Sequence, residues 1–219
     1  MILFLACFAP MIAAGAASED VLTRNEAGVK LFHDGKVEQA VAVLEKAVSE
    51  DGTYLPARIN LAHAYERLNR FDEAIQEYRR AVILEPQNFF AHNNLGVLLD
   101  QKGQYDEAIA EFEGALKSQP GNSMALRNLE TAKKNKTTIQ ERQRQIQSAE
   151  ENAQVKPEDP NASYHVARVH ASYGNKKLAL QWLDRSLRQG YKEIAQVKSD
   201  PAFASLRQDR DFELLLLGK

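Results

Sequence analysis

Three asparagines at a constant spacing are the residues of this chain best suited to binding chemistry. Asn60, Asn94 and Asn128 follow one another at intervals of 34 residues, and Glu26 stands one interval earlier. A carboxamide offers both a hydrogen-bond donor and an acceptor, so a row of them suits the backbone of an extended peptide of any sequence. The pattern predicts a peptide-binding row, and it leaves open the alternative that these side chains are solvated or bond to one another.

Catalytic and metal-binding chemistry has little support. The five histidines, His33, His63, His92, His165 and His170, fall in separate predicted helices, except for the last two, whose spacing of five residues places them off a common helical face. The chain carries no phosphate-binding glycine loop and no nucleophile elbow. We therefore predict a protein that is not an enzyme, with no cofactor and no metal.

The same interval of 34 residues organises the hydrophobic and small residues. Shifting the sequence by this distance superimposes Ala74 on Ala108, Tyr78 on Phe112 and Ala81 on Ala115, among others. A repeat of this length is typical of stacked supersecondary units. The units start near Val21, Leu55 and Phe89.

Each unit is predicted to be a hairpin of two amphipathic helices. A turn around Gly103 separates the helices in the clearest copy, and Pro120 ends the second one because proline lacks an amide donor and clashes with the preceding turn. Short side chains at Gly96, Ala108 and Ala115 would let the helices approach closely. Larger side chains, such as Phe112, would fill the space beside them.

The combination of period and columns resembles the tetratricopeptide repeat family, whose motif positions are matched by Leu95-Gly96-x2-Leu99, Ala108-x3-Phe112, Ala115 and Pro120. The resemblance implies an all-α fold, a right-handed α-solenoid with three clear repeats, one divergent repeat, and one further C-terminal hairpin with closing helices. It also implies that the first helix of each hairpin lines a concave face, which holds an extended segment of another protein. On this face the candidate peptide-binding residues are Asn60, Asn94, Asn128, Asn93, His63, Val97, Arg127 and Phe90.

One binding mode of the family is disfavoured. The carboxylate clamp of heat-shock chaperone partners needs Lys and Asn on the first helix and Lys and Arg on the third. The matching positions here are Asn25, Val29, Phe90 and Asn94. Without the cations, the clamp is not expected to form.

The organisation of the chain follows from the repeats and the punctuation between them. The array is expected at residues 21–136, with a capping helix from 123. A capping-box pattern beginning at Thr138 predicts a break near 135–138 and a separate polar helix at 138–155, although no glycine or proline forbids one continuous helix. Two prolines within residues 156–160 mark a boundary. A further hairpin is expected at 160–190 and closing helices at 191–219, with Asp200 and Asp209 as N-caps.

Residues 1–17 are predicted to be a signal peptide, because an apolar stretch stops at small residues just before the first charges. The protein is then exported, either periplasmic or secreted. The alternative is a chain tethered to the membrane by an uncleaved N-terminus or by a lipid on Cys7. Once the leader is removed, the chain has no cysteine and no membrane span.

Composition supports an interaction role. The formal charge of −2 and the lack of a strongly basic run argue against nucleic acid as a partner. The sequence therefore predicts a non-enzymatic interaction or scaffold module that binds another protein or an extended peptide, in a bacterial envelope complex. The alternative is a structural assembly subunit that self-associates through the polar helix or through Leu214–Leu217.

Overall fold

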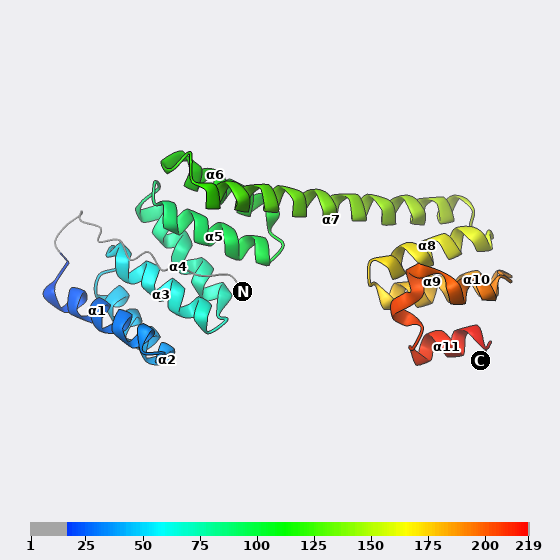
Figure 1. The fold of residues 1–219 in the computed structure, drawn as a ribbon, viewed down its shortest axis with the longest axis horizontal. Helices are drawn as coiled ribbons and strands as arrows, with labels where there is room; N and C mark the ends of the chain where they lie inside the picture. The colour runs from blue at the N-terminus through cyan, green and yellow to red at the C-terminus, as the bar shows by residue number, and fades with distance from the viewer. Residues whose placement is uncertain (1–16, 219) are drawn as a thin grey trace. The chain divides into compact units, whose positions relative to one another are not determined.

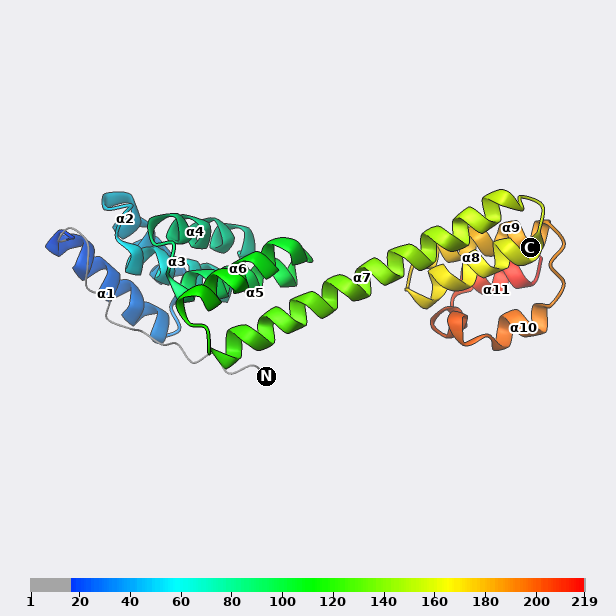
Figure 2. The same cartoon turned by 90° about the horizontal axis from the view of Figure 1, so that it is seen from above.

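The computed structural model describes residues 17–218, and every helix or strand assigned among them is a helix (Figures 1 and 2). The elements are α1 (Glu19–His33), α2 (Val37–Glu50), α3 (Leu55–Arg67), α4 (Phe71–Leu84), α5 (Phe89–Gln101), α6 (Tyr105–Ser118), α7 (Ser123–Val155), α8 (Pro160–Ser172), α9 (Lys176–Arg188), α10 (Ile194–Ser199), the 3-10 helix η1 (Pro201–Leu206) and α11 (Arg210–Leu216). The all-α prediction is confirmed. The predicted signal peptide lies, apart from Ala17, outside the described residues.

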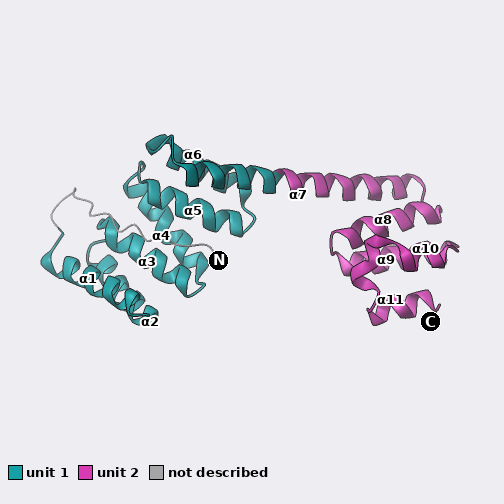
Figure 3. Ribbon diagram, in the orientation of Figure 1, with its two compact units in different colours: residues 1–136 teal, residues 137–219 magenta. Residues whose placement is uncertain are grey.

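The chain divides into two compact units between Lys136 and Thr137 (Figure 3). The first unit contains the hairpins α1–α2, α3–α4 and α5–α6, followed by the N-terminal part of α7. The second contains the rest of α7 and all later elements. Among the described helices, none is both long enough and apolar enough to cross a membrane.

The turn inside each hairpin requires a left-handed backbone at one position. Gly35, Asn69 and Gly103 occupy this position in the three hairpins of the first unit, with φ of 77°, 58° and 75°. Glycine adopts this conformation without a steric penalty, and asparagine tolerates it better than most residues. The turn of the second unit repeats the solution at Gly174, with φ of 76°.

The predicted small columns lie in the core. Ala40, Ala74 and Ala108, together with Ala47, Ala81 and Ala115, have no exposed surface. A Cβ on Gly96 would come within 2.7 Å of the Phe112 ring, and one on Gly28 within 2.5 Å of Leu44. The large side chain of each second helix therefore packs directly on the backbone of the first.

The expected break near 135–138 is wrong. Residues 123–155 form the single helix α7, which contains the sequence that resembled a capping box. Because this stretch has no proline or glycine, each amide between Thr137 and Glu141 can keep its intrahelical hydrogen bond. The helix continues although the packing changes from one compact unit to the other at this point.

The closing helices complete the core of the second unit. Phe203 of η1 and Phe212 of α11 are buried at 0% and 2% exposure, and their rings stack at 5.5 Å. Asp200 and Asp209 cap η1 and α11 as expected. The C-terminal leucines are divided, since Leu215 and Leu216 pack on this core while Leu214 and Leu217 are exposed.

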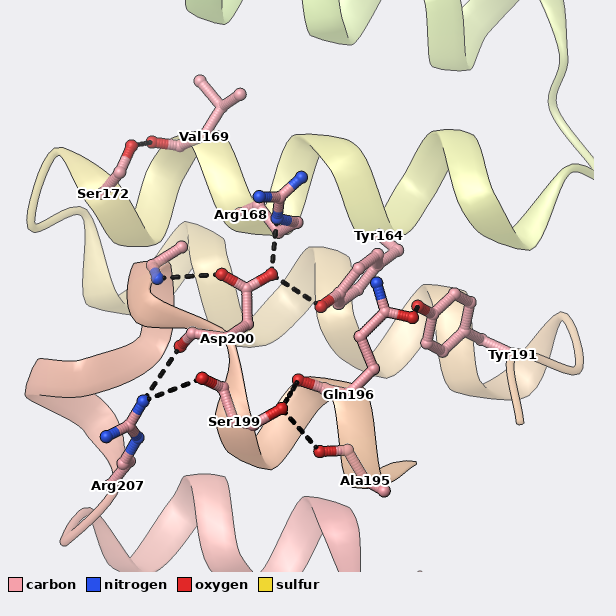
Figure 4. Close-up of polar contacts among 11 residues, drawn as sticks. Tyr164, Arg168, Val169, Ser172, Tyr191, Ala195, Gln196, Ser199, Asp200 and Arg207 are labelled. Atoms are coloured by element: carbon pink, nitrogen blue, oxygen red, sulfur yellow. Dashed lines mark hydrogen bonds and ion pairs between the residues drawn. The ribbon is translucent and has the colours of Figure 1, made fainter. Parts of the chain in front are cut away.

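Asp200 joins the closing segment to α8 (Figure 4). Its carboxylate accepts hydrogen bonds from the Tyr164 hydroxyl at 2.8 Å and the Ala202 amide at 2.9 Å, and it pairs with Arg168 at 2.6 Å. Burial alone would raise the pKa of Asp200. The two hydrogen bonds and the Arg168 charge outweigh it, so the pKa lies below its usual value.

Replacing Asp200 by alanine is expected to destabilise the second unit by about 1–3 kcal/mol, because the buried Tyr164 hydroxyl loses its acceptor and η1 its cap. Trp182, the sole tryptophan, lies in this unit, so its fluorescence during urea unfolding measures the effect. Asp184→Ala, which removes an exposed pair with Arg188, is the control and should cost less than about 1 kcal/mol. Equal losses in the two variants would contradict the linking role of Asp200.

Candidate functional site

The first helices of the three hairpins and the N-terminal part of α7 form one surface, here called the first-helix face. Hydrogen bonds connect consecutive helices along it. Asn60 on α3 donates to Asn25 on α1 at 2.8 Å, and Asn128 on α7 donates to Asn93 on α5 at 3.1 Å. Both bonds join residues 35 positions apart, which is one repeat plus one residue. The asparagines therefore form contacts that the stacking of the repeats creates.

Asn94 departs from this pattern because Ile59 stands where its partner would be. Isoleucine has no acceptor, so the Asn94 amide donates instead to His63 Nε2 at 2.9 Å and to the Tyr78 hydroxyl at 3.4 Å. Its oxygen accepts a bond from Asn93 at 3.2 Å. Both donors and one acceptor site of Asn94 are thus used within the fold, whereas Asn60 and Asn128 each make one hydrogen bond to a neighbouring helix.

Tyr78 is the centre of a buried polar cluster below this surface. It extends from α4 with no exposed surface, and its hydroxyl donates to Glu66 on α3 at 2.5 Å. Its ring meets that of His63 edge-on, with centroids 5.8 Å apart. Burial lowers the pKa of His63 to about 4. Burial also raises the pKa of Glu66 to about 7, an effect that the Tyr78 hydrogen bond only partly offsets.

These two pKa shifts predict opposite pH dependences that can be separated by mutation. With its raised pKa, Glu66 stabilises the folded state at low pH, and this contribution is lost as pH rises from about 4.5 to 7. With its lowered pKa, His63 binds a proton more readily when unfolded, so its contribution to stability falls as pH drops from about 6.5 to 4. His63→Gln should leave a stability that decreases with rising pH, and Glu66→Gln one that increases, each by at most about 1.4 kcal/mol per pH unit. Urea unfolding followed by circular dichroism across the mildly acidic to neutral range measures the slopes, and identical slopes in the two variants would contradict the assignment.

A small hollow of about 210 Å³ opens beside this cluster. Val29 and Phe32 of α1, Leu44 of α2, and Asn60 and His63 of α3 line it. Its walls are apolar except for one carboxamide and one imidazole, which is neutral at pH 7. The hollow can therefore accept an aliphatic chain beside a hydrogen-bonding group.

The other predicted site residues are placed differently. Asn93 is buried at 3% exposure, and half-buried Val97 packs against the core of the unit. Phe90 is half-buried and meets Phe89 edge-on at 5.4 Å. Arg127 is exposed. The structure thus connects Asn93, Asn94, Asn128 and His63 in one chain of hydrogen bonds, while the contacts of Phe90 and Val97 are apolar packing contacts.

Three participants were missing from the sequence-based set. Asn25 and Asn93 share one repeat column, and that periodicity could have identified Asn25. Tyr78 was assigned to the core column of Phe112, and nothing in that column indicates a hydroxyl that reaches the opposite face. Glu66 carries no sequence signal, because charged side chains are common on helices. Within residues 17–218, no group of three or more His, Cys, Asp or Glu side chains could hold a metal ion.

Comparison with known proteins agrees with the repeat geometry. A family model described as tetratricopeptide repeat matches residues 59–123. The first unit contains tetratricopeptide repeats. Anaphase-promoting complex subunit 6 of Arabidopsis thaliana is 33% identical to this chain over 88 residues, which are 38% of this chain and 16% of that protein. A chloroplast protein of the same plant is 34% identical over 61 residues, so the chain spans less than a fifth of the length of the curated relatives it matches.

Solved tetratricopeptide structures share the fold. The first such domain of Spaghetti (RPAP3), bound to the HSP90 peptide SRMEEVD, is 27% identical, with a TM-score of 0.52 over 55% of this chain and 97% of that one. A crystal structure of MamA has a TM-score of 0.52 and covers 83% of this chain and 96% of that one at 18% identity, a likeness of fold alone. The tetratricopeptide-type solenoid fold is therefore confirmed.

Proposed function

We propose that the protein is a non-enzymatic interaction module whose first-helix face, the concave face of the tetratricopeptide array, binds an extended segment of another protein. The observation that carries this proposal is the pair Asn60 and Asn128. Each uses one amide hydrogen for a neighbouring helix and keeps further donor and acceptor capacity. Such groups can bond to the backbone of a peptide. A solved relative of this fold is bound to a peptide, which supports the same use here.

The two partly free asparagines and the fully bonded Asn94 are expected to behave differently. Asn60→Ala with Asn128→Ala should weaken peptide binding about tenfold to a hundredfold, as two lost hydrogen bonds of about 1 kcal/mol each imply. Asn94→Ala should mainly lower stability, because His63 and Tyr78 lose a partner. The assay is anisotropy of labelled short peptides, selected from a random phage library on residues 18–219.

A matched control and a contrary outcome make this test decisive. Asn152 is an exposed asparagine of α7 in the second unit, and Asn152→Ala should leave binding unchanged. Binding that survives the Asn60 and Asn128 double variant, with its melting temperature unaltered, would remove these residues from the mechanism. A library that yields no peptide would contradict the proposed function.

We also propose that the protein is exported and acts in a bacterial envelope complex, with residues 1–17 removed. The support is the apolar leader that ends in small residues. Tagging both ends and comparing the size and the cell fraction of the product tests this. A product of full size that stays in the membrane fraction would favour the tethered alternative.

A further inference from the structure

Two carboxylates on the first-helix face have no cationic partner among the described residues. Several acidic side chains of the second helices pair with Lys or Arg, for example Glu77 with Arg58. The partners of Glu66 on α3 and Asp100 on α5 are instead neutral, namely the Tyr78 hydroxyl and the Asn135 amide. Glu66 and Asp100 lie 34 residues apart, in one repeat column. The proposed binding face therefore carries a repeated negative charge that the fold itself does not neutralise.

Glu66 adjoins the hollow on this face. His63, which lines the hollow, lies one helical turn before Glu66 on α3, so the two side chains share a face. Both reach the same group, since the His63 ring contacts Tyr78 edge-on and Glu66 accepts its hydroxyl hydrogen. The apolar wall of the hollow is made by Val29, Phe32 and Leu44. A neutral imidazole here does not repel a cation.

We infer that the partner segment carries a lysine or arginine whose aliphatic stem lies in the hollow and whose charged head pairs with Glu66, with Asp100 available to a second cation one repeat further on. This inference rests on the proposed function and adds the charge of the partner. Long basic side chains bury their stems against apolar surface and keep their heads at a polar group. Burial without a countercharge keeps the Glu66 pKa high, and a bound cation would supply that charge.

The inferred partner has the opposite charge to the acidic peptide SRMEEVD bound by the solved relative. The positions that would match a carboxylate clamp hold no cation here, since they are Asn25, Val29, Phe90 and Asn94. An acidic segment would meet two carboxylates that lack a countercharge instead. Charge complementarity on this face therefore favours a basic segment.

The test uses the peptides selected from the random library on residues 18–219. We expect enrichment of Lys and Arg, and a loss of affinity of about tenfold or more in Glu66→Gln, the size expected for a charge-assisted hydrogen bond. Glutamine keeps an oxygen to accept the Tyr78 hydrogen, so the fold is retained, and melting checks this. Replacing the basic residue of the peptide by Gln should cause the same loss, and combining both changes should add little. Glu38→Gln, an exposed charge change on α2, should leave affinity unchanged.

The outcomes separate this inference from the proposed function. Selected peptides that depend on Asn60 and Asn128 but show no basic enrichment, or that bind Glu66→Gln as tightly as the native chain, would overturn the inference and leave the function intact. Enrichment of acidic residues would do the same. Failure to select any peptide would overturn both.

Discussion

Replacing Gly96 by leucine is expected to lower the free energy of unfolding of the first unit by about 3 kcal/mol, the upper end of the usual cost of overpacking. Even a single Cβ at this position would lie 2.7 Å from Cε1 and 2.8 Å from Cδ1 of Phe112. The Phe112 ring is 1% exposed and has no free space to move into. The added side chain must therefore separate α5 from α6. Urea unfolding followed by far-UV circular dichroism measures the loss.

Two further variants make this prediction specific. Gly121→Ala is the control, because a Cβ there meets nothing within 4 Å and should change stability by less than about 0.5 kcal/mol. Phe112→Leu combined with Gly96→Ala should recover part of the loss of Gly96→Ala alone, since a smaller partner makes room. If Gly96→Leu and Gly121→Ala were equally stable, the close packing between α5 and α6 would not hold.

Replacing Glu77 by alanine is expected to cost about 3–5 kcal/mol, because it leaves a buried charge without its partner. Arg58 is 7% exposed, and its guanidinium pairs with Glu77 at 2.5 Å while also donating to the Gly52 carbonyl. No water replaces the lost carboxylate at this depth without rearrangement of α3 and α4. Arg80 also loses its partner, but its side chain is 57% exposed and can be solvated. Urea unfolding by circular dichroism gives the magnitude.

The control for Glu77 is an acidic residue in an exposed pair. Glu107 pairs with Arg79, and both side chains are about half exposed, so Glu107→Ala should cost about 0–1 kcal/mol. A cost for Glu77→Ala in this same range would mean that the Arg58 charge finds another partner. In that event the buried pair would not stabilise the junction of α3 and α4.

The buried pair also belongs to a repeated device. One period later His92 takes the place of Arg58, pairs with Glu111 at 2.7 Å and contacts the Pro86 carbonyl at 3.0 Å. Gly114 then replaces Arg80, and a Cβ there would lie 2.7 Å from the His92 ring. The side chain at this column therefore joins the preceding loop to the second helix in both hairpins. The interval of 34 residues contains this relation, but the change from arginine to histidine hides it.

Local signals predicted most of the fold. The alanine and glycine columns, the left-handed turn residues and the aspartate caps each act on residues close in sequence, so their effect can be read without a structure. The break expected near 135–138 is wrong because a capping-box pattern only favours a helix start and does not oblige one. Nothing local ends α7, and a change of packing partners is not a property of local sequence.

The sequence by itself determined the repeat, the hairpins and the asparagine columns, because these depend on side-chain size and spacing along one chain. Only the tertiary structure decided which asparagines remain free for a ligand. Asn60 and Asn94 are the same residue type in the same column, yet Asn60 faces Asn25 while Asn94 faces Ile59 and turns to His63 and Tyr78. The difference arises from a neighbour 35 residues away, which comes into contact only when the hairpins stack.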